Sequence, residues 1–74
     1  MGEEILLAPF TGVVKKIGVS VGERVTKGQS VFVLGSLYFA EGRDVSSRQT
    51  GIVEEVHVEL GQTINTGEPL LTLK

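Results

Sequence analysis

The sequence predicts an all-β fold, a flattened barrel built from two small antiparallel sheets. Ten glycines and many β-branched residues divide the 74-residue chain into short apolar runs, which is typical of strands joined by tight turns. Residues 12–34 and 51–73 align without a gap at a constant offset of 39 positions. The aligned pairs include three glycines and nine apolar residues. This pattern indicates an internal duplication, in which two similar halves are related by a pseudo-twofold axis.

The first predicted strands come from the apolar pattern at the start of the chain. Residues 5–7 form a short opening strand that ends before Pro9, because proline cannot donate a ladder hydrogen bond. Residues 13–21 form a half-buried strand, and Val14 and Lys15 break its alternation as a β-bulge would. The apolar residues expected on its inner face are Val13, Ile17, Val19 and Val21.

Tight turns are predicted at Gly22 and Gly28, because such turns often require a positive φ that only glycine adopts without strain. Val25 is expected to point into the core between these turns, and residues 31–34 form a continuous apolar strand. The second half repeats this order, with a strand over residues 52–60, a turn at Gly61, an inward Ile64, a turn at Gly67 and a strand over residues 70–73.

Residues 35–47 form a hairpin that joins the two halves and has no counterpart in the alignment. A pseudo-twofold axis would place the opening strand beside residues 70–73, and residues 44–46 beside residues 31–34. We therefore expect both chain ends at one end of the barrel and the hairpin tip at the other.

Size and composition limit the classes of function. A chain of 74 residues is expected to form one domain over residues 1–74. With no cysteine and one histidine, it offers neither a thiolate nor a histidine cluster for a metal. A net charge of −2 argues against a nucleic-acid partner. Because no apolar run approaches the ~20 residues that span a bilayer, we expect a cytoplasmic protein with no membrane partner.

The two halves resemble a known family, the biotinyl and lipoyl carrier domains. The resemblance covers nearly the whole chain and is nearer the biotinyl branch. The residues that carry it are 8–14, 19–29 and 31–34 in the first half, and 50–53, 58–62 and 66–71 in the second. It implies the fold known as a barrel-sandwich hybrid, and a role as a carrier of biotin or lipoate.

The chemistry of this family lies in the hairpin, where biotinyl domains usually read Glu-Ala-Met-Lys-Met and the lysine carries biotin. By the resemblance, Tyr38 replaces this lysine, and no lysine lies between Lys27 and Lys74. A phenol would form a labile ester instead of a stable amide. We therefore expect no biotin or lipoate cofactor. The residues at the five family positions are Gly35, Ser36, Leu37, Tyr38 and Phe39.

The hairpin tip is the predicted contact for a protein partner. Tyr38 and Phe39 are two of the four aromatic residues, and exposed aromatics are enriched at interfaces. The leading hypothesis is a docking module without an active site, related to carriers of biotin-dependent carboxylase or 2-oxo acid dehydrogenase complexes. Its partner would be a carboxylase, acyltransferase or ligase subunit. The expected contact residues are Leu37, Tyr38, Phe39, Glu41 and Arg43. Local packing of Phe39 and a simple turn at Glu41 remain the alternatives.

Two other functions stay open. The chain could be a true carrier that is modified at an atypical amine, for which Lys15 and Lys16 are the candidates. It could instead be an assembly module that resembles the lipoyl-like domain of membrane-fusion adaptors. Self-association would separate this assembly module from a docking module, because a docking module is expected to be a monomer in isolation.

The charged residues outside the hairpin are expected to lie on the surface. Lys15 and Lys16 align with Glu54 and Glu55, so equivalent faces of the two halves carry opposite charge. This difference either steers a partner or keeps a small β domain soluble. His57 is expected to be a surface residue near Glu55 and Glu59, and no catalytic arrangement of nucleophile, base and acid is predicted.

Overall fold

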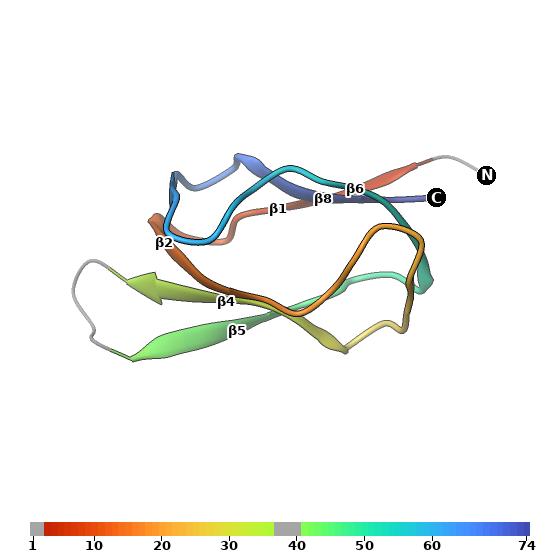
Figure 1. Cartoon of the computed structure of the whole chain (residues 1–74), viewed down its shortest axis with the longest axis horizontal. Coiled ribbons are helices and arrows are strands. Elements are labelled where there is room, and N and C mark those ends of the chain that lie inside the picture. Colours follow the sequence, from red (N-terminus) through yellow and green to blue (C-terminus); the bar gives the residue numbers. More distant parts are fainter. Residues whose placement is uncertain (1–2, 37–40) are drawn as a thin grey trace.

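The computed structural model describes residues 3–36 and 41–74 and confirms the all-β prediction (Figure 1). The strands are β1 (Glu4–Leu7), β2 (Gly12–Ile17), β3 (Arg24–Val25), β4 (Ser30–Ser36), β5 (Gly42–Ser46), β6 (Gly51–Val56), β7 (Thr63–Ile64) and β8 (Pro69–Leu73). They form two four-stranded antiparallel sheets with the orders β1-β8-β6-β3 and β5-β4-β2-β7. This is the flattened barrel of a barrel-sandwich hybrid.

Backbone hydrogen bonds between the halves occur in pairs that the 39-residue offset relates. The N–H of Gly22 donates to the carbonyl of Val53 over 2.8 Å, and the N–H of Gly61 donates to the carbonyl of Val14 over 2.8 Å. Each half therefore closes the other by the same contact.

The same relation extends to the edge strands. β1 pairs with β8 in the register Glu4↔Leu73, and β5 pairs with β4 in the register Arg43↔Leu34. Predicted neighbours are thus confirmed, with β1 beside β8 and β5 beside β4. The structural correspondence of the halves includes β1 and β5, which the sequence alignment left outside them.

The strands predicted over residues 13–21 and 52–60 are wrong at their C-terminal ends, because β2 and β6 are shorter. Val21 and Leu60, expected to face inward, are both 66% exposed. Each is the second residue of a four-residue turn whose third residue is a glycine. The chain has left the sheet at this point, and the side chain is directed to solvent.

The bulge predicted in β2 is confirmed, since the pairing with β4 shifts between Val14 and Lys16. The prediction that Val13 faces the core is wrong. Val14 is only 1% exposed, whereas Val13 is half-buried. The extra residue, Lys15, reverses the alternation, and the pairing of β6 with β8 shifts at the equivalent place.

Four turns share the sequence pattern x-x-Gly-Glu/Gln, at residues 20–23, 26–29, 59–62 and 65–68. In each, the N–H of the fourth residue donates to the carbonyl of the first. The glycine has a φ of 84° to 92°, which type II turns require at this position. The carboxyl or amide oxygen of the fourth side chain accepts from the N–H of the first residue, over 2.6 to 3.0 Å. The predicted glycine turns are confirmed, and this second hydrogen bond strengthens them.

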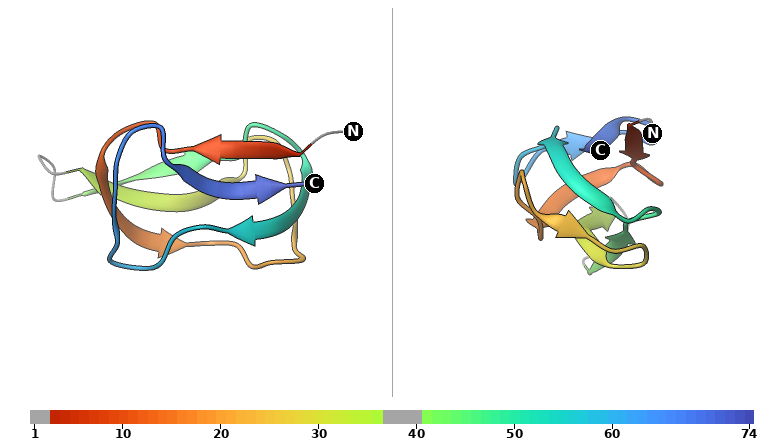
Figure 2. Two further views of the ribbon diagram at one scale, coloured as in Figure 1. Left: turned by 90° about the horizontal axis from the view of Figure 1, so that it is seen from above. Right: turned by 90° about the vertical axis from the view of Figure 1, so that its right-hand side faces the viewer.

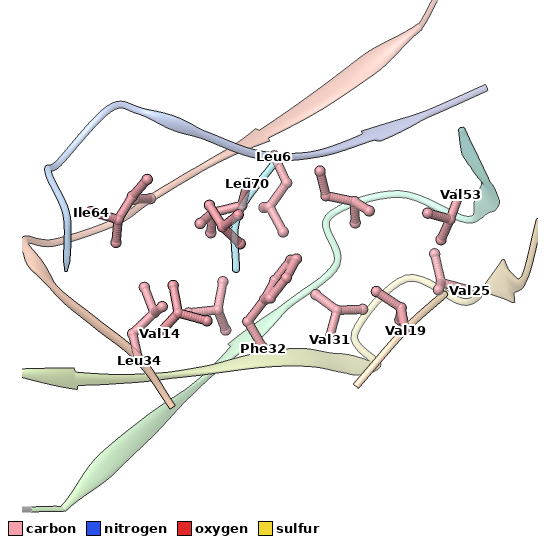
Figure 3. Packing of buried hydrophobic residues seen from close by; sticks show 14 of the residues in the cluster. Leu6, Val14, Val19, Val25, Val31, Phe32, Leu34, Val53, Ile64 and Leu70 are labelled. Atoms are coloured by element: carbon pink, nitrogen blue, oxygen red, sulfur yellow. The ribbon is translucent and has the colours of Figure 1, made fainter. Parts of the chain in front are cut away.

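The core lies between the two sheets (Figure 3). The Phe32 ring extends from β4 toward Leu6 on the opposite sheet. Val25 and Ile64 are 0% and 1% exposed, as the sequence predicted. The buried apolar residues are Leu6, Ala8, Val14, Val19, Val25, Val31, Phe32, Leu34, Val45, Val53, Val58, Ile64, Leu70, Leu71 and Leu73.

The barrel measures 37 × 18 × 17 Å, and its long axis separates the hairpin from the C-terminus. β4 ends and β5 begins at one end, while β1 begins and β8 ends at the other, as expected (Figures 1 and 2). Nowhere in residues 3–36 and 41–74 is there a helix with the length and hydropathy needed to cross a membrane.

We expect Gly61→Ala to lower the free energy of unfolding by about 1–2 kcal/mol, the usual cost of a left-handed backbone with a side chain. No atom lies within 4 Å of a Cβ placed there, so the loss would come from the backbone alone. Gly61→Asn is the matched control, since asparagine tolerates this conformation and should lose less. Urea denaturation measures both variants, and equal losses would contradict the argument.

Candidate functional site

The predicted partner site lies at the β4–β5 hairpin. Leu37, Tyr38 and Phe39 fall outside the described residues. Glu41 and Arg43 are described, and both are exposed at the hairpin end of the barrel. Arg43 belongs to β5 and pairs in register with β4.

The base of the hairpin is held by close backbone packing. A Cβ at Gly12 would overlap the carbonyl oxygen of Gly35, so β2 and β4 approach here as only glycine allows. A Cβ at Gly42 would overlap a methyl group of Val33. These contacts fix the direction in which the hairpin leaves the barrel.

Further along the hairpin, Ser30 Oγ donates to Asp44 Oδ1 over 2.8 Å. This bond joins β4 to β5 on the outer face, away from the core.

The side chain of Lys15 lies against the hairpin base. A Cβ at Gly35 would overlap the Cε of Lys15, and its Cγ and Cδ lie near as well. The methylenes of Lys15 therefore pass directly over Gly35, the first of the five positions that the family places in its hairpin sequence. By contrast, Lys27 belongs to the turn at residues 26–29, where its backbone N–H donates to Thr50 Oγ1 over 2.9 Å.

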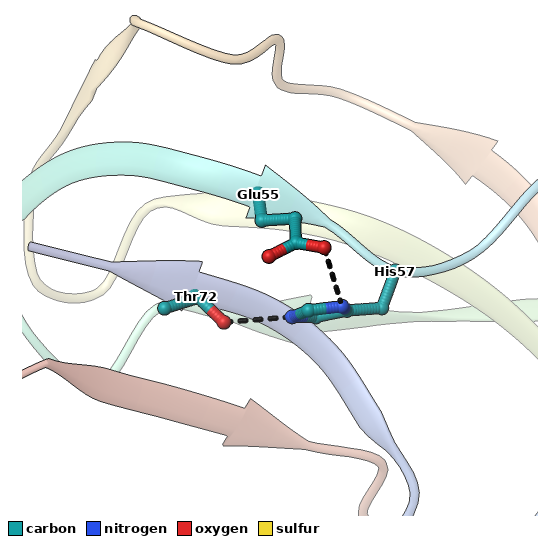
Figure 4. A network of polar contacts seen from close by, with 3 residues as sticks. All are labelled: Glu55, His57 and Thr72. Atoms are coloured by element: carbon teal, nitrogen blue, oxygen red, sulfur yellow. Dashed lines mark hydrogen bonds and ion pairs between the residues drawn. The ribbon is translucent and has the colours of Figure 1, made fainter.

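A second polar group lies on the outer face of the β1-β8-β6 sheet (Figure 4). His57 Nδ1 is 3.6 Å from Glu55 Oε2, and His57 Nε2 is 2.7 Å from Thr72 Oγ1. The sequence predicted His57 beside Glu55, and this is confirmed. It missed Thr72, which the register of β6 with β8 places opposite Glu55.

Acid, base and hydroxyl thus stand in the order of a hydrolytic triad, which the sequence did not predict. Two observations argue against catalysis. Thr72 is only 6% exposed, so a substrate would not reach its hydroxyl. The hollow of about 1080 Å³ along β1 and the hollow of about 360 Å³ beside Gly18 are both lined by residues other than Glu55, His57 and Thr72. The imidazole, whose side chain is 25% exposed, instead covers and satisfies the buried hydroxyl.

Carboxylates crowd the same outer face near the start of β1. The protonated carboxyl of Glu3 can donate a hydrogen bond to Glu54, and this bond, together with the charges of Glu54 and Glu55, raises the pKa of Glu3 above its ordinary value. This end of the sheet is therefore acidic. Among the described residues, no group of three histidine, aspartate or glutamate side chains is arranged to hold a metal ion.

Comparison with known proteins agrees with this geometry. A family model described as biotin-requiring enzyme matches residues 43–73. The biotin carboxyl carrier protein of acetyl-CoA carboxylase from Solanum lycopersicum is 32% identical over 69 residues, covering 93% of this chain and 96% of that protein. The chain belongs to the biotinyl/lipoyl carrier domain family.

Other relatives of this carrier-family domain are longer. The biotin carboxyl carrier protein of Streptococcus mutans is 32% identical over 66 residues, and the match covers 89% of this chain and 49% of that protein. The mitochondrial propionyl-CoA carboxylase alpha chain of Homo sapiens is 30% identical over 70 residues, with 95% of this chain and 9% of that one covered. The chain thus spans about half of the first relative and about a tenth of the second.

Solved structures show the same fold. A single-chain, multi-domain long-chain acyl-CoA carboxylase matches with a TM-score of 0.86 and 27% identity, over 96% of this chain and 7% of that one. The Kluyveromyces lactis urea carboxylase matches all of this chain and 6% of its own, with a TM-score of 0.88 and 20% identity. The second likeness is one of fold alone.

We expect His57→Ala to lower the free energy of unfolding by about 1–3 kcal/mol, because it leaves the buried Thr72 hydroxyl without a partner. Thr72→Val replaces the hydroxyl by a methyl group of similar size and should cost less. The double variant should then be more stable than the sum of the two losses predicts. Additive losses in chemical denaturation would show that the two side chains are not coupled.

Proposed function

We propose that this chain is a docking module of the carrier family that does not itself carry biotin or lipoate. The observation that supports the proposal is the distribution of lysines. They stand at positions 15, 16, 27 and 74, so the hairpin sequence holds none. By its resemblance to the family, the attachment position is occupied by Tyr38, whose phenol cannot form a stable amide.

The partner that fits this proposal is a subunit of a biotin-dependent carboxylase, or an acyltransferase or ligase that carrier domains visit. Relatives named as carboxylase carriers and carboxylase chains support the first of these. The proposed contact is formed by the hairpin tip, and the charged side chains of Glu41 and Arg43 set the orientation of the partner. Its residues are Leu37, Tyr38, Phe39, Glu41 and Arg43. The domain acts in the cytoplasm as a monomer and has no active site of its own.

Incubation with a biotin ligase or a lipoate ligase should leave the mass of the wild-type chain unchanged. Tyr38→Lys restores an amine at the family's attachment position and should gain one acyl group. Tyr38→Phe is the matched control and should gain none. Intact-mass spectrometry measures the mass of all three proteins, and acylation of the wild-type chain would show that the proposal is wrong.

A second candidate function is acylation at Lys15, which the packing of its side chain over Gly35 favours over Lys16. The same experiment separates the two functions. If the wild-type chain gains an acyl group that Lys15→Arg abolishes and Lys16→Arg retains, the domain is a carrier with a displaced acceptor.

We expect Tyr38→Ala with Phe39→Ala to weaken binding to a purified carboxylase subunit by tenfold or more, about 1.4 kcal/mol, because interface aromatics contribute much of the contact energy. Val21→Ala is the control, since Val21 is 66% exposed and belongs to a turn distant from the hairpin. Titration calorimetry measures the affinities. An equal loss in the control, or no binding by the wild type, would argue against docking through the tip.

A further inference from the structure

The two halves share one backbone arrangement, yet the equivalent edge strands carry different side chains. Ile5 and Leu7 on β1 are 54% and 50% exposed. Their counterparts on β5, at the 39-residue offset, are Asp44 and Ser46. Because β5 forms with polar side chains at these positions, the fold does not require apolar ones on β1. The exposed pair therefore calls for a reason other than folding.

β1 is the outer strand of its sheet, and among the described strands it pairs with β8 alone (Figure 2). An edge strand presents unpaired backbone groups to any extended segment that approaches. β5 is an edge strand too, but Arg43 and Asp44 lie on it, and charged side chains discourage such pairing. β1 has a charged residue at its start, Glu4, which corresponds to Arg43, and none from Ile5 to Leu7.

A groove of about 1080 Å³ separates the two edges. Its lining includes the buried side chains Leu6, Val45 and Leu73. The turns at residues 26–29 and 65–68 contribute to its two ends, since Lys27 and Thr66 line it. The groove provides room beside β1 for an added strand.

The surface near β1 also differs in charge from the equivalent surface of the other sheet. Glu3, Glu54 and Glu55 crowd together beside β1, where a hydrogen bond with Glu54 and the charges of Glu54 and Glu55 raise the pKa of Glu3. The counterparts of Glu54 and Glu55 on the other sheet are Lys15 and Lys16. A cationic partner would relieve the repulsion on the first surface, whereas the second would repel it.

We infer that β1 is a docking edge for an extended peptide segment of a partner, in which apolar residues alternate with lysine or arginine. Backbone hydrogen bonds add this segment to the β1-β8-β6-β3 sheet. Its apolar side chains enter the groove over Leu6, Val45 and Leu73. On the opposite face, the methylenes of its lysine or arginine residues lie along Ile5 and Leu7, and their charges reach Glu3. This surface is separate from the hairpin and does not depend on the function proposed for it.

A second copy of the chain fits the edge less well. Its basic surface, around Lys15 and Lys16, has no exposed large apolar residue to match Ile5 and Leu7. The other exposed large apolar residues of the described chain are Val21 and Leu60, which lie in turns. A contact between two different surfaces of neighbouring copies would close into a ring only if its rotation allowed it, and would otherwise give an open filament.

The test uses a synthetic peptide of alternating valine and lysine, and a control peptide in which glutamate replaces lysine. Amide chemical shifts of the wild-type chain should change around residues 4–7 with the first peptide only. Ile5→Ser with Leu7→Ser removes both exposed apolar side chains without adding a charge, Ser46 occupies the position on β5 that corresponds to Leu7, and the variant should weaken binding at least about tenfold. Val21→Ser with Leu60→Ser removes an equal number of exposed apolar residues and should change the affinity less than about twofold.

Several outcomes would overturn the inference. If the β1 variant retained the peptide affinity of the wild-type chain, the edge would not be the binding site. The same would follow if both variants lost affinity equally. Shift changes on β2, or on β5 without changes on β1, would contradict the proposed pairing, and equal binding of the glutamate peptide would contradict the proposed charge. If the wild-type chain sediments as a dimer and the β1 variant as a monomer, the occupant is a second copy and the peptide proposal is wrong.

Discussion

The structure depends on one reciprocal contact, in which each half of the chain closes the other. The N–H groups of Gly22 and Gly61 donate across the pseudo-twofold axis to the carbonyls of Val53 and Val14. The side chains of these two valines are each 1% exposed, so the residues that accept the bonds also fill the core. A chain of 74 residues has little apolar surface to bury, and this coupling lets backbone pairing and core packing form together.

The sequence could predict the parts of the fold that follow from local pattern. Glycine spacing located all four turns, and the offset between the halves located the paired strands. Side-chain direction at Val21 and Leu60 could not be predicted from alternation, because both residues lie in turns where the period of two no longer applies. Thr72 was missed beside His57 for another reason. That contact depends on the register of β6 with β8, which no local pattern contains. The tip residues predicted for the partner site fall outside the described chain.

The pseudo-symmetry separates what the fold requires from what it permits. Backbone contacts, turns and buried residues recur at equivalent positions, so they belong to the fold. Positions on the outer faces of the two sheets differ: His57 corresponds to Gly18, and the buried Thr72 corresponds to Val33. The imidazole of His57 covers the outer face of one sheet. At the equivalent place the other sheet has a hollow of about 360 Å³, which is lined by Gly18 and Val33. Such differences cost the barrel little, and they give two faces of one scaffold different chemistry.

The two ends of the barrel are also held to different degrees. At the hairpin end, a Cβ at Gly12 would overlap the carbonyl oxygen of Gly35. At the opposite end, the equivalent Cβ at Gly51 would lie 3.0 Å from the carbonyl oxygen of Lys74. The backbone therefore packs more closely beneath the hairpin than beneath the chain end. This packing involves residues 12 and 35, so the barrel itself sets the base from which the hairpin begins.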